Sequence, residues 1–382
     1  MPEILFVPET QSCNYWLYAP WGKTGEGACH HLAHHCADVA ACFEVLAAQP
    51  VVRARMETAA GRSLSPVDIA RLAVLAFLHD AGKLHPGFQA KGWPKGVWQK
   101  SLHGHVREGA AIFARGVDGL TIARNLHLDK LNEWGVDENI LFAALAHHGR
   151  PFQMETGVEK RWRDGRKLGY DPVAASGEMG VMMGRWFAEA FAADGGKLPD
   201  KSELQHLLCG LVSLADWLGS TQSLFTFSAT LDPDYMTKAR EKARKAVADI
   251  GIDAGPWRKA IMGRADFATL TQGRTPRAAQ RLVGELPLEE RLVILEAETG
   301  SGKTEAALWR FARLFEAGKV DGLYFALPTR AAAKQIHGRV HEAMERLFGA
   351  PAAADCAGRA RLSQGRRERG AGIARLVGAL GR

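Results

Sequence analysis

The sequence predicts a mainly α-helical bundle followed by an incomplete α/β domain that begins with a phosphate-binding loop. Apolar residues recur at helical spacing in the first part of the chain. Of the 14 histidines, only His337 and His341 lie beyond His206, so the first part carries nearly all of the imidazole groups. Beyond about residue 266, short apolar runs alternate with helical stretches, which is typical of a parallel α/β sheet.

Length and composition agree with two globular domains. The chain has 382 residues, and single hydrophobic cores stop growing at roughly 250–300 residues. Its net charge of +7 favours a polyanionic partner. The six cysteines form no CxxC pair, so we expect reduced thiols. No signal-peptide pattern is visible, and no apolar run approaches the ~20 residues of a membrane span. We therefore expect a cytoplasmic monomer without membrane contact.

The first clear helix signal begins at Ser65. Its hydroxyl can cap the helix, Pro66 suits the first turn, and Asp68 favours the positive end of the helix dipole. Helical spacing then continues through His79 and Asp80. The sequence therefore predicts one helix that carries the His-Asp pair near its end.

Two further helices are predicted around other histidines and aspartates. Asp137 precedes a helical pattern over residues 138–148, which Pro151 closes. Ser202 opens a third helix with a leucine stripe, and Asp216 lies beside that stripe near its end. These side chains thus fall on or just after helices, as a metal site inside a helical bundle requires.

The second part of the chain has a different pattern. Residues 221–265 form a predicted connector, rich in Ser and Thr and then in charged residues. The apolar runs at 291–297 and 322–329 predict two parallel strands, each followed by a helix. Residues 350–382 hold no aromatic residue and predict a disordered tail. Because two strands cannot cover a parallel sheet, we expect that the chain is truncated or frame-shifted near residue 350.

Histidines and aspartates supply a candidate metal cage around His79 and Asp80 in FLHDAGK. The other candidates are His35 and Asp38 in HHCADVA, His105 in HGHVREGA, His147 and His148 in LAHHGRP, and Asp216 in LADWLGS. Imidazole nitrogens mixed with carboxylates suit divalent transition metals, and open coordination positions suit hydrolysis. The pattern predicts a metal-dependent hydrolase. We expect no ligand role for His30, His31 or His34.

A second motif, AETGSGKT, matches a Walker phosphate loop with Ala297 in place of the first glycine. The backbone amides of three residues are expected to cradle phosphates, namely Gly300, Ser301 and Gly302. Lys303 would reach the terminal phosphates and Thr304 would meet magnesium. The loop is therefore a candidate site for ATP with magnesium.

In combination, these motifs resemble the CRISPR-associated nuclease-helicase of type I systems (the Cas-three family). The segments that carry the resemblance are HHCADVAA, FLHDAGK, HVREGA, AHHGRP, LADWLGS, AETGSGKTEAAL and FALPTRAAAKQ, within roughly residues 20–349. The resemblance implies an HD nuclease domain at 20–220 and a partial superfamily 2 helicase domain of RecA-like fold at 266–349. It also implies degradation of single-stranded DNA in antiviral defence, with a Cascade-type surveillance complex as partner.

The same resemblance implies two metal ions and assigns their ligands. The first ion would be held by His35, His79, Asp80 and Asp216, and the second by His105, His147 and His148 with Asp80 bridging. We expect Mn, Fe, Co or Ni, because most of these ligands are imidazoles. His79 and Asp80 are the expected catalytic residues. Lys83 follows His79 by one helical turn and either neutralises phosphate charge or is a solvated lysine at a helix end.

The resemblance extends to three residues of the helicase part. In TPRAAQ, Gln280 matches the position that reads adenine, and in FALPTRA, Thr329 and Arg330 match positions near the DNA backbone. A working helicase also needs an acidic motif for magnesium and the attacking water, and no DExH or DExD sequence follows residue 330. We therefore do not expect these 382 residues alone to unwind DNA.

Two other functional classes stay open on the sequence. One is an HD phosphohydrolase that acts on small nucleotides, although such a substrate requires neither the basic charge nor the attached phosphate loop. The other is a non-catalytic remnant that binds DNA or a Cascade-type complex. That second class would require a broken metal cage, yet every expected ligand position is filled.

Overall fold

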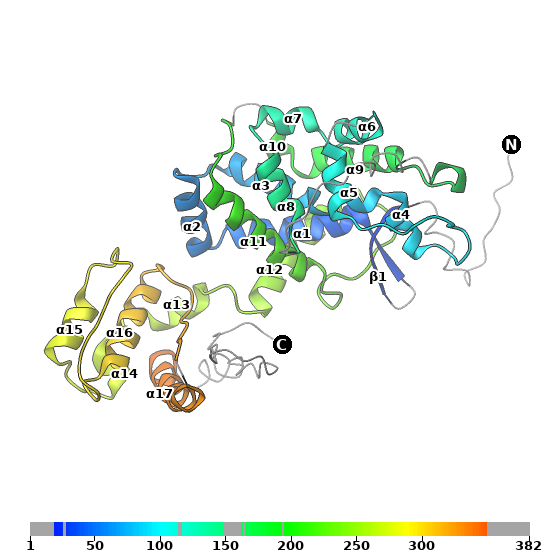
Figure 1. Cartoon of the computed structure of the whole chain (residues 1–382). Helices are drawn as coiled ribbons and strands as arrows, with labels where there is room; N and C mark the ends of the chain where they lie inside the picture. The colour runs from blue at the N-terminus through cyan, green and yellow to red at the C-terminus, as the bar shows by residue number, and fades with distance from the viewer. Residues whose placement is uncertain are drawn as a thin grey trace. The chain divides into compact units, whose positions relative to one another are not determined.

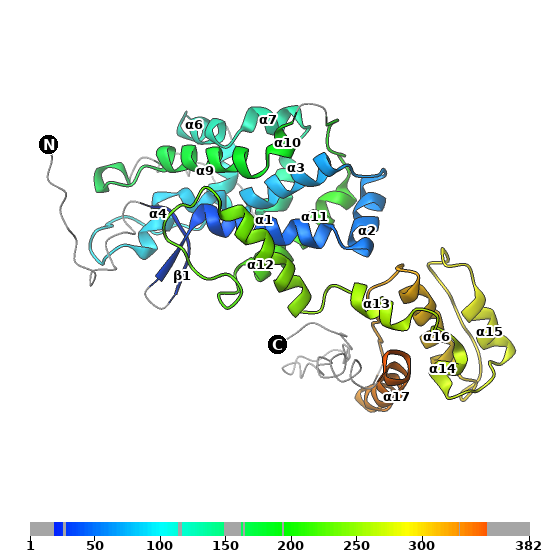
Figure 2. The same cartoon turned by 180° about the vertical axis from the view of Figure 1, so that it is seen from behind.

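The computed structural model describes residues 19–25, 28–113, 117–148, 162, 165–192, 195–327 and 329–349. They form two compact units that divide between Ala246 and Val247 (Figures 1 and 2). The predicted connector is shared between the units, since Tyr235 is buried in the first and Ile261 belongs to the core of the second. The predicted tail lies outside the described residues.

The first unit is the predicted helical bundle, with a small hairpin at one side (Figure 1). The hairpin pairs β1 (Trp21–Gly25) with β2 (Ala28–His31) in antiparallel orientation. The helices are α1 (Leu32–Ala47), α2 (Pro50–Ala60), α3 (Pro66–Phe77), α4 (Pro86–Gln89), α5 (Val106–Phe113), α6 (Val117–Asn125), α7 (Leu128–Glu133), α8 (Glu138–Leu145), α9 (Pro172–Trp186), α10 (Ala188–Phe191), α11 (Ser202–Gly219) and α12 (Tyr235–Asp249).

Helix α1 is the centre of this unit and packs against both α3 and α11. All of its residues are buried except Glu44 and Val45, and the buried ones include the polar side chains His35 and Asp38. Buried polar groups require polar partners, so we expect other polar side chains to surround the middle of α1 inside the bundle. Among the described residues, no single helix has the length and apolar composition of a membrane span; α1 and α2 reach both only as a pair across a 90° bend.

Helix α3 begins as predicted but ends earlier. The Ser65 hydroxyl accepts the backbone N–H of Asp68, and the Asp68 carboxylate accepts the backbone N–H of Ser65, which makes a complete capping box. The predicted continuation through Asp80 is wrong, because α3 stops at Phe77.

A 3-10 turn, η2 (Leu78–Leu84), takes over from α3 and carries the His-Asp pair. Its Gly82 touches the start of α5, where a Cβ would lie 1.7 Å from the carbonyl oxygen of His105 and 2.4 Å from the amide nitrogen of Gly109. Only glycine allows this backbone contact. The tight turn therefore brings η2 against the segment that carries the next candidate ligand.

Of the other two predicted helices, one has the expected length and one is shorter. Helix α11 spans Ser202–Gly219, as predicted. Helix α8 ends at Leu145, so the predicted helix over 138–148 is too long by its last turn. Beyond the helix end, the carbonyl oxygen of His147 accepts the Ser213 hydroxyl of α11.

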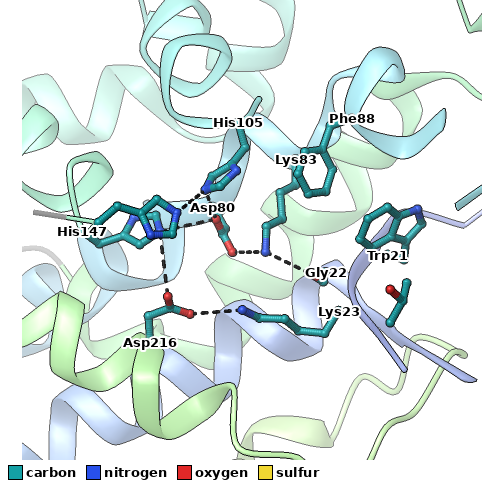
Figure 3. A pocket seen from close by; sticks show the side chains of 11 residues that line it. Trp21, Gly22, Lys23, Asp80, Lys83, Phe88, His105, His147 and Asp216 are labelled. Carbon is teal, nitrogen blue, oxygen red and sulfur yellow. Dashed lines mark hydrogen bonds and ion pairs between the residues drawn. The ribbon is translucent and has the colours of Figure 1, made fainter. Parts of the chain in front are cut away.

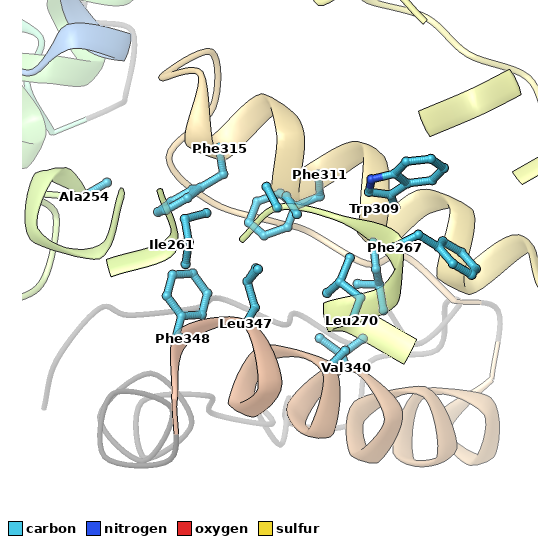
Figure 4. Close-up of a cluster of buried hydrophobic side chains, with 14 residues drawn as sticks. Ala254, Ile261, Phe267, Leu270, Trp309, Phe311, Phe315, Val340, Leu347 and Phe348 are labelled. Atoms are coloured by element: carbon cyan, nitrogen blue, oxygen red, sulfur yellow. The ribbon is translucent and has the colours of Figure 1, made fainter. Parts of the chain in front are cut away.

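The second unit contains five described helices, and all of them except the third contribute residues to one apolar core (Figure 4). They are α13 (Gly255–Ile261), α14 (Phe267–Thr271), α15 (Ala278–Glu285), α16 (Lys303–Glu316) and α17 (Arg330–Phe348). Aromatic residues of α16, among them Phe311 and Phe315, meet Leu347 and Phe348 at the end of α17. The helices that follow the two apolar runs are thus present.

The two predicted strands of this unit are not formed in the described residues. Residues 291–297 and 322–327 are neither helix nor strand and have no ladder partners. In the first of them, the side chains of Leu292 and Ile294 are 79% and 78% exposed. A strand exists only through hydrogen bonds to a neighbour, and an apolar run does not specify that neighbour. The sequence prediction of strands was therefore wrong here, although the order of apolar run, loop and helix is right.

Candidate metal centre

Seven of the sequence-predicted side chains meet inside the first unit, although they come from five separate segments. Figure 3 shows Asp80, His105, His147 and Asp216 among the side chains that line the pocket. They are His35 on α1, His79 and Asp80 on η2, His105 before α5, His147 and His148 after α8, and Asp216 on α11. They form two groups, and within each group one possible ligand atom per residue lies within 4.8 Å of the others. The structure thus brings together the seven ligands that the family resemblance assigned, but not Asp38.

The first group consists of His35, His79, Asp80 and Asp216. The His35 Nε2 atom lies 3.0 Å from Asp80 Oδ2 and 3.4 Å from Asp216 Oδ1. The His79 Nε2 atom lies 3.2 Å and 3.7 Å from the same two oxygens. Two imidazole nitrogens and two carboxylate oxygens therefore converge on one point, which is a plausible divalent metal environment.

The second group consists of His105, His147 and His148. The Nε2 atoms of His105 and His148 lie 2.9 Å apart. The other oxygen of Asp80, Oδ1, lies 3.3 Å from His105 Nε2 and 3.8 Å from His147 Nε2. Asp80 therefore presents one oxygen to each group, as a bridging carboxylate would.

The orientation of His79 favours metal binding. Its Nδ1 lies 2.8 Å from the carbonyl oxygen of Ala76, so this nitrogen donates and Nε2 keeps its lone pair for the pocket. Neither His79 Nε2 nor Asp80 Oδ1 has a hydrogen-bond partner among the described residues, although both are buried. Buried polar atoms without partners are costly. A metal ion would satisfy both, so the side chains present fit a pair of divalent ions.

Electrostatics support the same assignment. Burial lowers the pKa of His105 to about 4 and that of His147 to about 3, so both rings are neutral at pH 7 and can act as ligands. Burial alone would also lower the pKa of His79, but the negative charges of Asp80 and Asp216 raise it to about 9. Burial also opposes ionisation of Asp216, yet the adjacent His35 and His79 rings hold its pKa well below the usual range. Metal ions must therefore compete with a proton at His79.

Lys83 lies in this pocket, so the alternative of a solvated helix-end lysine is wrong. Its side chain is 6% exposed and its Nζ lies 2.5 Å from Asp80 Oδ2. The same ammonium group donates to the carbonyl oxygen of Gly22 at 2.8 Å. Lys83 therefore balances the charge of Asp80 and ties the η2 turn to strand β1.

Sequence reasoning missed the contribution of the β-hairpin. Lys23 of β1 lies at the same pocket, with its Nζ 3.6 Å from Asp216 Oδ1. Burial and the nearby Lys83 lower the pKa of Lys23. The only signal was the basic residue in WGKT, 12 residues before His35, with no histidine or acid beside it. The pocket has a volume of about 270 Å³ and is also lined by Trp21 and Phe88 (Figure 3).

Asp38 does not join the metal groups, although the HxxD spacing suggested it. Its Oδ2 lies 2.8 Å from His30 Nε2 and accepts the hydroxyl of Tyr235 at 3.3 Å. These partners lie away from the pocket and already satisfy that oxygen. The histidines without a predicted ligand role, His30, His31 and His34, are absent from both groups within the described part of the chain.

Two glycines determine the backbone shape of the phosphate loop in the second unit. Gly300 and Gly302 have φ values of 82° and 89°, in the left-handed region that glycine favours. The Gln280 amide nitrogen donates to the carbonyl oxygen of Gly302 at 3.0 Å, so this side chain lies against the loop. Lys303 donates to the carbonyl oxygens of Ala297 and Glu298. Its ammonium group is therefore held by the loop itself.

The other predicted nucleotide-binding and DNA-binding residues also lie in the second unit. Lys303 and Thr304 line a pocket of about 380 Å³ together with Phe325. The Ser301 hydroxyl is buried and has no hydrogen-bond partner among the described residues. The Thr329 hydroxyl accepts the backbone N–H of Ala332 and caps α17. Arg330 begins α17, and the prediction for its side chain falls outside the described residues.

The helical bundle and its histidine–aspartate pocket define the first unit as an HD-type domain. Residues 21–225 match the family described as "Cas3, HD domain", and residues 277–382 match "DEAD/DEAH box helicase". The chain belongs to the Cas3 nuclease/helicase family. The family resemblance and the predicted fold class, an HD helical bundle followed by an incomplete P-loop helicase domain, are thereby confirmed.

Known proteins agree with this membership. The chain is 29% identical over 373 residues to the CRISPR-associated endonuclease/helicase Cas3 of Escherichia coli (strain K12), covering 89% of this chain and 41% of that protein. It is 34% identical over 360 residues to the protein of the same name from Thermus thermophilus, covering 86% and 36%. A crystal structure of a CRISPR-associated protein has the same fold, with a TM-score of 0.64, 24% identity and coverage of 93% and 40%. The chain thus spans about two fifths of the curated relatives' length.

Proposed function

We propose that this chain is a metal-dependent nuclease that degrades single-stranded DNA in CRISPR antiviral defence, joined to the first part of an ATP-dependent DNA helicase. The observation that carries the proposal is Asp80, which presents one oxygen to each of two groups of metal-ligating side chains. Two ions about 3.5–4 Å apart, once bound, would polarise a phosphate and activate the attacking water. This is the chemistry that hydrolyses phosphodiesters.

The side chains around the site have distinct roles in this proposal. His35, His79 and Asp216 would hold the first ion together with Asp80, and His105, His147 and His148 would hold the second. Ala76 fixes the tautomer of His79 through its carbonyl oxygen. Lys83 holds Asp80 in place and contributes positive charge beside the scissile phosphate.

A DNA substrate is favoured over a small nucleotide by two features. The chain carries a net charge of +7, and a phosphate loop with a nucleotide-sized pocket follows the HD unit. A nuclease that works with a helicase meets single strands, so the same features favour single-stranded DNA. We further propose a Cascade-type surveillance complex as partner, a cytoplasmic location and a monomeric chain, all of which rest on family membership and charge.

The function can be tested with purified protein. Single-stranded DNA and nucleoside triphosphates are incubated separately with the chain, with and without manganese. Manganese-dependent cleavage of DNA, with triphosphates left intact, is the expected result. Preferential triphosphate hydrolysis would instead establish the small-nucleotide phosphohydrolase, and DNA binding without any hydrolysis would establish the non-catalytic remnant.

Metal preference gives a first prediction. Mn, Co, Ni or Fe should support faster cleavage than Mg, because five of the seven proposed ligands are imidazoles and Mg prefers oxygen ligands. Initial cleavage rates on one labelled oligonucleotide, measured after chelation and reloading with each ion, test this. Equal or faster cleavage in Mg alone would contradict the proposed ligand set.

The phosphate loop gives a second prediction. Lys303→Ala should leave single-strand cleavage unchanged, because all seven proposed metal ligands lie in the first compact unit. ATP turnover by the 382-residue chain should be negligible, since it has no DExH or DExD sequence after residue 330. A coupled ATPase assay with DNA present measures the turnover. Brisk DNA-stimulated hydrolysis that Lys303→Ala abolishes would contradict the prediction.

A further inference from the structure

Two lysines reach the metal pocket, and their ammonium groups differ in burial and in the partners that they already bind. The Lys83 ammonium group is buried and already binds both Asp80 and the Gly22 carbonyl oxygen. The Lys23 side chain is 29% exposed. Within the described part of the chain it forms an ion pair with Asp216, whose N–O distance of 3.6 Å exceeds the 2.5 Å between Lys83 and Asp80. Figure 3 shows Lys23 extending along the pocket toward Asp216 from the strand that carries Gly22. Lys23 therefore stands between the ligand groups and solvent.

Strand β1 holds this lysine firmly over the pocket. The Gln89 side chain accepts the backbone N–H of Trp21 at 2.9 Å and donates to the Trp21 carbonyl oxygen at 3.0 Å. The indole N–H of Trp21 donates to the Gln89 carbonyl oxygen at 3.0 Å. Gly22 lies directly on α1, where a Cβ would be 2.7 Å from the Cβ of His35. A strand fixed at these points leaves Lys23 little freedom except in its own side chain.

Charge balance indicates what Lys23 would face in the working site. Once His79 has given up its proton to bind an ion, Asp80 and Asp216 carry two negative charges, and Lys83 and Lys23 carry two positive charges. Two divalent ions would make the pocket strongly positive and would take over the Asp216 carboxylate. The Lys23 ammonium group would then lose its partner beside a site that attracts anions. A partly exposed ammonium group in that position suits a phosphate oxygen.

We infer that Lys23 is a substrate-binding residue, whose ammonium group binds a non-bridging oxygen of the DNA phosphodiester at the mouth of the metal pocket. This inference rests on the proposed nuclease function. Under this inference the β-hairpin takes a direct part in substrate binding. The Lys23 ammonium group joins that of Lys83 at the site, although it comes from a segment outside the histidine motifs.

Binding of uncleaved DNA tests the inference apart from activity. The probe is a fluorescent oligothymidine with native phosphodiester linkages, titrated in manganese at salt concentrations from 50 to 200 mM and read on ice before cleavage sets in. Lys23→Met removes the charge and keeps the length of the side chain, whereas Lys23→Arg keeps the charge. Lys130→Met is the matched control, because Lys130 is an exposed lysine of the same unit that pairs with Glu133.

Lys23→Met should weaken DNA binding by roughly tenfold at low salt, as expected for one charge-assisted hydrogen bond. The slope of log K against log salt should become shallower by about 0.7, the value for one phosphate contact on a single strand. Lys23→Arg should bind DNA nearly as wild type does, and Lys130→Met should be unchanged. Manganese bound per chain, measured by atomic emission, should not fall in Lys23→Met.

Unchanged DNA affinity and salt slope in Lys23→Met would overturn the inference. A parallel loss of manganese would also overturn it, since Lys23 would then act through the metal ligands. Wild-type protein that neither binds manganese nor cuts DNA would instead refute the proposed function.

Discussion

Asp80→Asn should eliminate DNA cleavage, with a loss of more than about a hundredfold, while the fold is kept. Even residues that only support a metal ligand change metal affinity or activity by 10–100-fold, so a ligand shared by two ions should have a larger effect. Asparagine preserves the shape of the side chain, and His79→Ala should give the same loss by removing a ligand of the first group. Asp80→Ala is harsher, because it also leaves the buried Lys83 ammonium group without its carboxylate.

Asp38→Asn is the matched control for this experiment. Asp38 is a fully buried aspartate on α1, in the same unit, but it contacts His30 and Tyr235. Burial raises the pKa of Asp38 well above its usual range, and asparagine keeps a side-chain oxygen that can accept the Tyr235 hydroxyl. Cleavage and manganese content should stay near wild type. Cleavage that survives in both Asp80→Asn and His79→Ala would refute the two-metal assignment.

Gly82→Ala should destabilise the first unit by at least about 3 kcal/mol, the upper range for overpacking a core. The added methyl group would lie 1.7 Å from the His105 carbonyl oxygen and 2.4 Å from the Gly109 amide nitrogen. Both are backbone atoms, so no side chain can move aside. To relieve this clash, η2 must move away from the start of α5. That movement would also separate Asp80 from His105. Urea denaturation and manganese binding should both show the damage.

Gly210→Ala provides the comparison. Gly210 lies within α11, the helix that carries Asp216, and a Cβ there would meet nothing within 4 Å. Alanine is favoured over glycine inside a helix by about 1 kcal/mol, so this variant should be slightly more stable and should bind manganese normally. Wild-type stability in Gly82→Ala would show that the contact between η2 and α5 can relax.

The candidate ligands could be predicted from the sequence because each carries a local motif. His79 and Asp80 are adjacent, His147 and His148 are adjacent, and Asp216 sits in a helix with a clear leucine stripe. Residue type and helical spacing suffice to propose such positions. Their assembly into two groups depended on the family resemblance, and the structure now supplies the distances.

The hairpin could not be predicted in the same way. Strand β1 has five residues without regular alternation, and Lys23 owes its position to Gln89, more than 60 residues later. Contacts of that separation leave no periodic signal in the chain. The short turn η2 was missed for a similar reason, because Asp80 leaves the helical geometry (φ −109°, ψ 15°) within a turn whose Gly82 packs on the distant backbone of His105. Local propensity was overridden by packing at both places.

The apolar run at 291–295 affects how the protein behaves at high concentration. Leu292 and Ile294 expose most of their surface, and the backbone beside them has no ladder partner within the described residues. An open, apolar, β-prone segment is a template for pairing with another chain. This segment therefore gives the second unit a possible route to association between chains, whereas the proposed chemistry belongs to the first unit. Dilute, salt-controlled samples are the appropriate state in which to measure that chemistry.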